Sequence, residues 1–357
     1  MMLIVNRILW ILNLLAGLAL LLSYAAPYVS PMIWWIAAFF GLAFPLLFVI
    51  NLLFALYWLI NGKLKLIFSL ACLFLGYPHF GKVYKLSGNE TARTENDVLL
   101  MSMNVKYFGQ TDGKIFLDSL LDEFSKENPD IVCFQEFAEH PDYSKKQASS
   151  DKVKKKLGLK YMIMKDPKYG SPGKGTAIFT RFKPIRNGYV SFGPGNVNGA
   201  IWADLILNEK DTVRVYSCHL QSNNLGRKEE FHQQDVQNQE VAVKKSKSII
   251  KRLKVGFEKR SEQVALVCEH MESSPYKIII AGDMNDTQLS YAYRRIRGEK
   301  KDAFVESGKG AGNTYVGPFP SYRIDYIFHD PSFESFNYKN GGNFGSDHKQ
   351  IQVLIKH

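Results

Sequence analysis

The sequence predicts a layered α/β domain that follows a set of membrane-spanning helices. No Lys, Arg, Asp or Glu occurs between Ile8 and Gly62, although a single bilayer crossing needs only about 20 apolar residues. Beyond this apolar part, short strand-like runs alternate with longer helical patterns, and mixed elements of this kind form layered α/β domains. The 357 residues therefore divide into a membrane anchor and a polar domain.

Three apolar runs are candidate membrane helices: Ile8 to Ala26, Met32 to Ile60, and Leu66 to Phe80. No clear cleavage signal follows the first run, so we expect a retained helix. The second run carries Trp and Tyr side chains near its ends, where such rings favour the bilayer interface, and it is the strongest candidate. The third is shorter and closes at Pro78, so it either spans or lies at the interface. We expect two to three helices in the lipid bilayer.

The few positive charges of the anchor set the expected topology. Arg7 precedes the first run, and Lys63 and Lys65 lie between the second and third runs. Positively charged loops stay in the cytoplasm, so both regions are expected there. We therefore expect a multi-pass membrane protein, with the polar domain extracytoplasmic if three helices span and cytoplasmic if only two do.

The chain is divided into residues 1–80 as the anchor, residues 81–96 as a polar linker and residues 97–357 as the polar domain. Strands are expected, from apolar runs that end in polar residues, at Val98–Asn104, Ile131–Gln135, Gly175–Thr180, Ala200–Leu207, Thr212–His219, Lys277–Ala281, Arg323–Phe328 and Gln350–Ile355. Helical patterns cover Lys114–Asn128 and Leu225–Ser273. No internal repeat is detected.

The net charge of +11 suits an anionic substrate or a membrane surface, but it serves solubility equally well and ranks no substrate. Basic residues gather in the middle of the second helical pattern: Lys244, Lys245, Lys247, Lys251, Arg252, Lys254, Lys259 and Arg260. This stretch is either a solvated helix face or a surface that contacts anionic lipid or substrate. The four cysteines show neither close pairing nor metal-ligand spacing, so we expect no disulfide framework and no zinc site.

Polar side chains stand where several apolar strands end, and a strand end holds a side chain rigidly beside a cleft. Asn104 and Glu136 each follow such a run, and His219 ends another. Each residue is ordinary alone: a turn residue is the commoner role for Asn104 or Glu136, and a structural role is the commoner one for a single histidine. Their joint occurrence indicates a site.

The stretch Gly282-Asp283-Met284-Asn285 is more specific. Glycine at its start allows a close turn, so that Asp283 and Asn285 can point the same way.

A further acid, Asp325, stands in the middle of an expected strand, where a buried carboxylate without a partner would be costly. His348 is the expected partner, because a carboxylate fixes the tautomer and orientation of an imidazole. The pair is expected to act as one unit.

Together these stretches resemble the endonuclease/exonuclease/phosphatase superfamily, over about Asp97 to His357, and their order along the chain also agrees. The resemblance rests on Gln135-Glu136, His219-Leu220, Gly282-Asp283-Met284-Asn285, Arg323-Ile324-Asp325-Tyr326 and Ser346-Asp347-His348. It implies a four-layer sandwich, in which two central β-sheets pack face to face with helices outside. It also implies hydrolysis of phosphoesters with a divalent metal, so the polar domain would be catalytic.

The resemblance assigns a role to each candidate residue. It implies that Glu136 binds Mg²⁺ or Mn²⁺ with Asn104 beside it, and that Asp347 contributes to the metal environment, since oxygen ligands suit these hard cations.

The remaining five residues would be catalytic. By the same resemblance, Asp283 and Asn285 position the attacking water and a phosphate oxygen. Asp325 holds His348, whose imidazole either activates water or stabilises the transition state, and His219 assists the leaving group or clamps the phosphate.

The substrate stays open, because selectivity lies in variable loops. The sequence His219-Leu220-Gln221 is similar to the corresponding stretch in sphingomyelinase-like members. The anchor would also place the cleft near lipid head groups, and both observations favour a lipid or inositol phosphate. A nuclease acting on DNA or RNA is the alternative, since a basic surface can follow a nucleic-acid backbone. A catalytically inactive, membrane-bound binding protein is a third possibility, although family members that lose activity usually also lose the catalytic motifs. The oligomeric state is not predicted.

Overall fold

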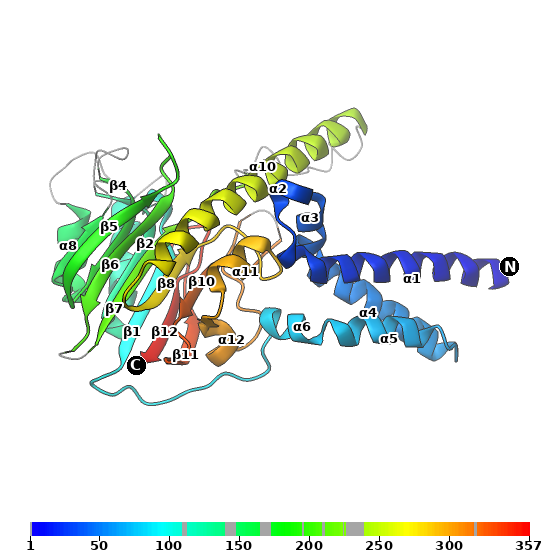
Figure 1. The fold of residues 1–357 in the computed structure, drawn as a ribbon, viewed down its shortest axis with the longest axis horizontal. Coiled ribbons are helices and arrows are strands. Elements are labelled where there is room, and N and C mark those ends of the chain that lie inside the picture. The colour runs from blue at the N-terminus through cyan, green and yellow to red at the C-terminus, as the bar shows by residue number, and fades with distance from the viewer. Residues whose placement is uncertain are drawn as a thin grey trace.

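The polar part of the chain is built on two six-stranded β-sheets (Figure 1). In this computed structural model the first sheet runs, in spatial order, β11 (Glu334–Asn340), β12 (Ile351–Lys356), β1 (Val98–Asn104), β2 (Ile131–Ala138), β4 (Lys174–Thr180) and β3 (Tyr161–Met164). The second runs β5 (Lys183–Ser191), β6 (Gly199–Ile206), β7 (Thr212–His219), β8 (Lys277–Asp283), β10 (Asp325–His329) and β9 (Lys301–Asp302). Among the strands that the structure describes, only β1–β2 and β7–β8 pair in parallel, one pair at the centre of each sheet.

The structure describes residues 2–108, 113–139, 148–164, 173–194, 196–208, 211–223, 225, 239–317 and 320–357. Within these ranges the anchor contains α1 (Met2–Ala25), α2 (Pro31–Trp34), α3 (Ile36–Leu42), α4 (Phe44–Ile60), α5 (Leu66–Leu75) and α6 (Tyr77–Val83). The helices of the polar domain are α7 (Gly113–Glu127), α8 (Ser149–Leu157), α10 (Gln239–Glu272), α11 (Tyr291–Arg297) and α12 (Ala303–Ser307).

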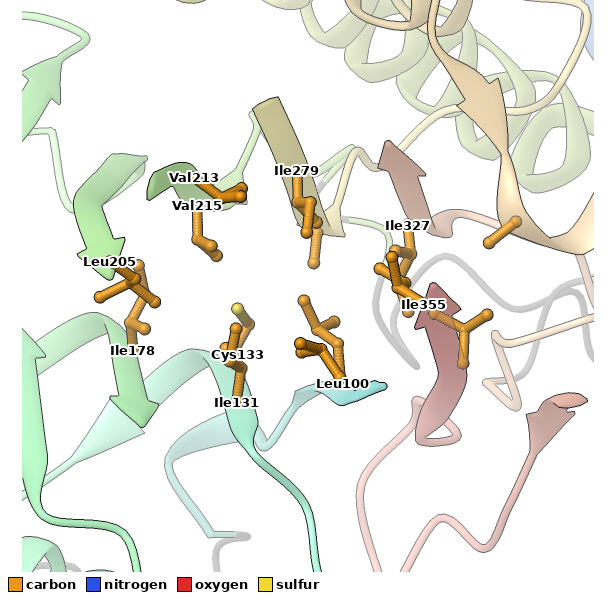
Figure 2. Close-up of a cluster of buried hydrophobic side chains, with 14 of the residues drawn as sticks. Leu100, Ile131, Cys133, Ile178, Leu205, Val213, Val215, Ile279, Ile327 and Ile355 are labelled. Atoms are coloured by element: carbon orange, nitrogen blue, oxygen red, sulfur yellow. The ribbon is translucent and has the colours of Figure 1, made fainter. Parts of the chain in front are cut away.

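Three apolar clusters create four layers. Figure 2 shows the middle cluster, in which Leu100 and Ile131 of the first sheet face Val215 and Ile279 of the second. Residues of α7 and α8 pack on the outer face of the first sheet, and residues of α10 and α11 pack on the outer face of the second. Because both faces of each sheet are covered, central strands such as β1 are buried along their whole length. The predicted four-layer α/β sandwich is confirmed.

One expected strand begins later than the sequence indicates. The run Arg323–Phe328 was expected to be a strand with Asp325 in its middle, but β10 starts at Asp325. The amides of Ile324 and Asp325 donate instead to the Thr314 hydroxyl. Arg323 is fully buried, and its guanidinium pairs with the Asp302 carboxylate at 2.9 Å. The carboxylate of Asp325 therefore lies at the start of β10, on the side of the sheet where the neighbouring strand β8 ends.

The long basic helix also differs from expectation. Helix α10 begins at Gln239; Leu225, where the helical pattern began, is not helical, and residues 226–238 of that pattern lie outside the described residues. Arg260 belongs to no solvated or lipid-contacting face, because it is fully buried and its Nε lies 3.0 Å from Asp286 Oδ2. The remaining basic residues of the stretch are exposed or half-buried.

The anchor contains one helix long and apolar enough to cross a membrane, over Leu3–Tyr28, and up to three spans if each bent helix pair counts as one. The expectation of a single helix from Met32 to Ile60 is wrong: the chain breaks into α2, α3 and α4, with a 65° bend between α3 and α4. Pro45 at the start of α4 lacks the N–H that a continuous helix needs. Helices α5 and α6 meet at 58°.

The anchor and the polar domain are packed against each other (Figure 1). Leu289, in the segment between β8 and α11, lies in one apolar cluster with Leu20 of α1 and Phe44 of α4. The buried Arg323 also donates to the carbonyl of Lys82 at 2.9 Å. The segment that follows β8 therefore packs directly on the apolar N-terminal helices.

The first residues of the expected linker, 81–83, belong to α6. Farther along, Lys85 pairs with Gly310 as an isolated β-bridge, and the amide of Thr91 donates to the side chain of Asn337 at 2.9 Å. Residues 84–96 thus follow the edge of the polar domain.

A pH-dependent contribution to stability is expected from Glu306 in α12. Although burial opposes it, hydrogen bonds from His329, Ser335 and Lys301 lower the pKa of Glu306 to about 2. A lowered carboxyl pKa stabilises the fold above the unfolded value of 4.5, and that stabilisation is lost as pH falls toward 2. Glu306→Gln is expected to lose about 1–2 kcal/mol at neutral pH, with solvent screening taken into account.

Urea unfolding of the full-length chain at several pH values measures this effect. The gap in unfolding free energy between wild type and Glu306→Gln should shrink between pH 4.5 and pH 2. A gap that stays constant over this interval would contradict the assignment.

Candidate active site

The carboxyl ends of the two central parallel pairs, β1–β2 and β7–β8, carry predicted site residues at one edge of the sandwich. A pocket of about 340 Å³ opens there and is lined by Asn104, Lys106, Glu136, Ser222, Leu225, Asp283, Asn285, Tyr315, Asp347 and His348. Six of the eight predicted site residues line it. The other two, His219 and Asp325, lie within 4 Å of residues that do.

Glu136 reaches the pocket through a β-bulge. The register between β2 and β4 shifts between Phe134 and Phe137, and Glu136 has a φ of 49°. Bulges of this kind redirect a side chain, and strained backbone of this kind gathers at functional sites. The side-chain amide of Asn104 donates to Glu136 Oε1 at 3.2 Å and to Asp283 Oδ2 at 3.0 Å, so it bridges the two carboxylates.

Gln135, next to Glu136, points away from the pocket. It is fully buried, and its amide donates to the hydroxyl of Ser217 in β7 at 3.0 Å. This hydrogen bond joins the two sheets directly behind the site.

Asp283 and Asn285 do point the same way, as the sequence indicates. Gly282 has a φ of 140°, and a Cβ there would collide with the carbonyl oxygen of Cys218 on the neighbouring strand, so the turn requires glycine. The side-chain amide of Asn285 donates to Asp283 Oδ2 at 3.1 Å and to the carbonyl of Leu220 at the same distance. Burial raises the pKa of Asp283 to about 6, against the lowering effect of His348.

Asp325 and His348 form the expected pair. His348 Nδ1 lies 2.9 Å from Asp325 Oδ2, and His348 Nε2 lies 3.6 Å from Asp283 Oδ2. All three side chains are almost fully buried. Burial alone would lower the pKa of His348, but the charges of Asp325 and Asp283 raise it to about 10. The imidazole is therefore held as a cation between two carboxylates.

His219 faces the same group of carboxylates. Its Nε2 lies 3.6 Å from both Glu136 Oε1 and Asp283 Oδ2, beyond hydrogen-bond distance, and has no hydrogen-bond partner although it is buried. A buried imidazole nitrogen without a partner is costly, and it points to a group that binds in the pocket.

Asp347 lies at the rim, where its carboxylate pairs with Lys106 Nζ at 2.8 Å. Lys106 and Tyr315 were not predicted. Lys106 follows Asn104 by two residues, and its amide donates to the Asn104 side chain at 3.0 Å. Tyr315 reaches the site because it pairs with His348 as an isolated β-bridge. Proximity to Asn104 could have indicated Lys106, whereas no local signal marks Tyr315.

Two groups could hold a cation. Asp283, Asp325 and His348 each place one ligand atom within 4.8 Å of the others. However, the shortest contact in this group is the hydrogen bond between Asp325 and His348, so these two side chains are already engaged with each other. The pocket wall formed by Glu136 and Asp347 instead offers carboxylate oxygens, the donors that Mg²⁺ and Mn²⁺ prefer, with the side chain of Asn104 beside Glu136. This second group fits the expected metal.

The same fold and family occur in known proteins. Residues 6–83 match a domain of unknown function (DUF8431), and no curated protein matches the chain in sequence. Solved structures with this fold include a humanized D. rerio TDP2 with 14 mutations, at TM-score 0.54 and 16% identity over 74% of this chain and 100% of that one. Another is D. rerio TDP2 complexed with single strand DNA product, at TM-score 0.53 and 16% identity over 73% and 99% of the two chains.

A third is an endonuclease/exonuclease/phosphatase from Bacteroides vulgatus, at TM-score 0.54 and 16% identity over 74% of this chain and 99% of that chain. At these identities the likeness concerns the fold alone. The sequence match is more specific: residues 101–250 and 254–348, more than half of the chain, match the endonuclease/exonuclease/phosphatase family. The chain belongs to this family.

Proposed function

We propose that the chain is a membrane-anchored hydrolase of phosphoester or phosphodiester bonds that depends on a divalent metal and uses direct attack by water. The observation that carries this proposal is that one pocket is lined both by Glu136, a carboxylate on a strained bulge, and by His348, which is paired with Asp325. Such a site can offset the charge of a phosphate and also places an acid–base pair, Asp325 and His348, next to it.

Glu136 would hold the metal, with Asn104 and Asp347 beside it. When bound, Mg²⁺ or Mn²⁺ would act as a Lewis acid toward a phosphate oxygen. Lys106, paired with Asp347 at the rim, adds a positive charge on the same side of the pocket.

The protein's own groups account for the proton transfers. Asp283 and Asn285 hold the attacking water, and Asp283 takes its proton as the new oxygen–phosphorus bond forms. The Nε2–H of His348 faces the phosphate oxygens, and Asp325 fixes the orientation of the ring. When the bond from phosphorus to the leaving oxygen breaks, His219 is placed to donate a proton to that oxygen. Water and substrate thus yield a phosphate product and an alcohol.

A nuclease is the second candidate. It is supported by the D. rerio TDP2 structure complexed with single strand DNA product, which has the same fold. A binding protein without activity is a weaker candidate, because the eight predicted site residues are all present in and around one pocket.

The number of membrane crossings decides on which side of the membrane the catalytic domain lies. If each bent helix pair is one span, three crossings place the catalytic domain outside the cytoplasm. A periplasmic reporter fused after His357 should then be active, whereas activity of only a cytoplasmic reporter would indicate two crossings.

Hydrolysis of a small substrate panel by the full-length chain tests the function. The panel contains bis-p-nitrophenyl phosphate, an inositol phosphate, a single-stranded oligonucleotide and a dispersed phospholipid, each with Mg²⁺, Mn²⁺ or chelator. We expect turnover that requires metal. Turnover that persists in chelator would contradict the metal, and a folded protein without any turnover would favour the binding protein.

A further inference from the structure

A second cavity lies beside the catalytic pocket and is mainly apolar. Its volume is about 300 Å³. Its walls include Leu42 at the end of α3, Ile249, Leu253 and Phe257 on α10, and Ile324 just before β10. The cavity is thus lined by residues of the anchor, the long helix and the polar domain; Figure 1 shows α3 and α10 at this junction.

This apolar cavity adjoins the catalytic pocket. Four residues line both: Ser222, Leu225, Asn285 and Tyr315. Asn285 is the residue that holds Asp283, so a molecule with its phosphate in the catalytic pocket would extend directly past Asn285 into the apolar cavity.

The cavity also borders the apolar N-terminal helices. Leu42 belongs to α3, which leads into α4 as one of the candidate bent spans. Beside it, the ring of Phe39 packs edge-on against Phe257 of α10, with 5.3 Å between ring centroids. On the neighbouring α2, Ile33 is 85% exposed, so this segment presents apolar side chains outward, as a segment at a bilayer surface does.

Two polar side chains of the cavity wall, Asp286 and Asn223, are engaged with Arg260, whereas the buried hydroxyl of Thr287 has no hydrogen-bond partner among the residues that the structure describes. Asp286 pairs with the buried Arg260, and Arg260 also donates to the side chain of Asn223 at 2.9 Å. The part of the wall formed by Leu42, Ile249 and Leu253 is aliphatic. This aliphatic part of the wall, formed by residues of α3 and α10, matches a hydrocarbon chain, and the rings of Phe257, Tyr315 and Tyr322 also line the cavity.

We propose that the substrate is a bilayer lipid phosphoester whose hydrocarbon chain occupies this apolar cavity while its phosphate lies in the catalytic pocket; this rests on the phosphoesterase function proposed above. The lipid enters beside α3, where the anchor borders the cavity. The anchor therefore forms part of the substrate site in addition to tethering the domain to the membrane. Chain length then sets specificity, because each methylene buried in the cavity raises kcat/KM by roughly fourfold.

Two phosphodiesters with the same leaving group test this. One carries an octyl group and the other a methyl group, and both release p-nitrophenol. The full-length chain is held in amphipol, so that no detergent chain competes for the cavity. The ratio of kcat/KM for the octyl ester to that for the methyl ester cancels effects on the chemical step.

Ile249→Trp fills the cavity, and Ile250→Trp is the matched control, because Ile250 is 45% exposed on the same helix and does not line the cavity. We expect wild type to prefer the octyl ester, Ile249→Trp to lower the ratio by at least about tenfold, and Ile250→Trp to keep the wild-type ratio. If Ile249→Trp turns over neither ester, Leu42→Phe fills the same cavity from the anchor and takes its place.

A wild-type ratio near one, or an unchanged ratio in the cavity-filling variant, would overturn the lipid site and leave the phosphoesterase standing. Faster hydrolysis of a single-stranded oligonucleotide than of either ester would overturn it in favour of a nuclease. No turnover of any compound, with folded protein, would overturn both the proposed function and the lipid site.

Discussion

Glu136→Gln is expected to lower kcat/KM for phosphodiester hydrolysis by roughly 10³-fold, as large a loss as any single substitution in the site should cause. Glutamine has the same shape and can still accept the hydrogen bond from Asn104, so the bulge should persist. What is lost is the negative charge that would hold the metal. Higher Mg²⁺ or Mn²⁺ should therefore restore part of the activity.

Activity measured over a range of Mn²⁺ concentrations checks this prediction. Glu334→Gln is a suitable control, because Glu334 is exposed at the start of β11, away from the pocket. The control should behave as wild type. Near-normal activity of Glu136→Gln at every metal concentration would remove Glu136 from the metal site.

His348→Asn is expected to lower kcat by roughly 10³-fold. The asparagine amide can take the place of Nδ1 and donate to Asp325, but nothing replaces the Nε2–H that faces Asp283 and the substrate. Asparagine is the better test than alanine, because alanine would also remove the hydrogen bond to Asp325, leave that buried carboxylate without a partner and destabilise the fold.

Asp325→Asn should cause a smaller loss, roughly 10²-fold, because it acts only through the orientation and charge of His348. Since the two residues act as one unit, the double variant should lose little more than His348→Asn alone. Steady-state kinetics of the four proteins give this comparison. Losses that multiply in the double variant would show that the two residues act independently.

Much of the catalytic domain follows from local sequence signals. The apolar runs that end in Asn104, His219 and Asp283 are strands in the structure, and the resemblance of the motifs indicated the correct four-layer fold. The positive φ at Gly282 confirms why a glycine precedes Asp283. These features depend on neighbours along the chain, which a sequence displays directly.

Other features depend on contacts between distant segments. The bulge that redirects Glu136 arises from a register shift against β4, and Tyr315 reaches the site through a bridge to His348. The run from Met32 to Ile60 has the composition of one helix, but a proline and the packing of Phe39 on α10 divide it. For the same reason, no sequence signal indicated the apolar cavity, whose walls come from the anchor, α10 and the segment before β10.

The most direct test of the metal-dependent phosphoesterase is turnover of bis-p-nitrophenyl phosphate by the full-length chain, stripped with chelator and then titrated with Mn²⁺. We expect no turnover without metal, saturable activation on titration, and a shift of that activation to higher Mn²⁺ in Glu136→Gln. Equal turnover with and without metal, or activation unaffected by Glu136→Gln, would contradict the proposed site.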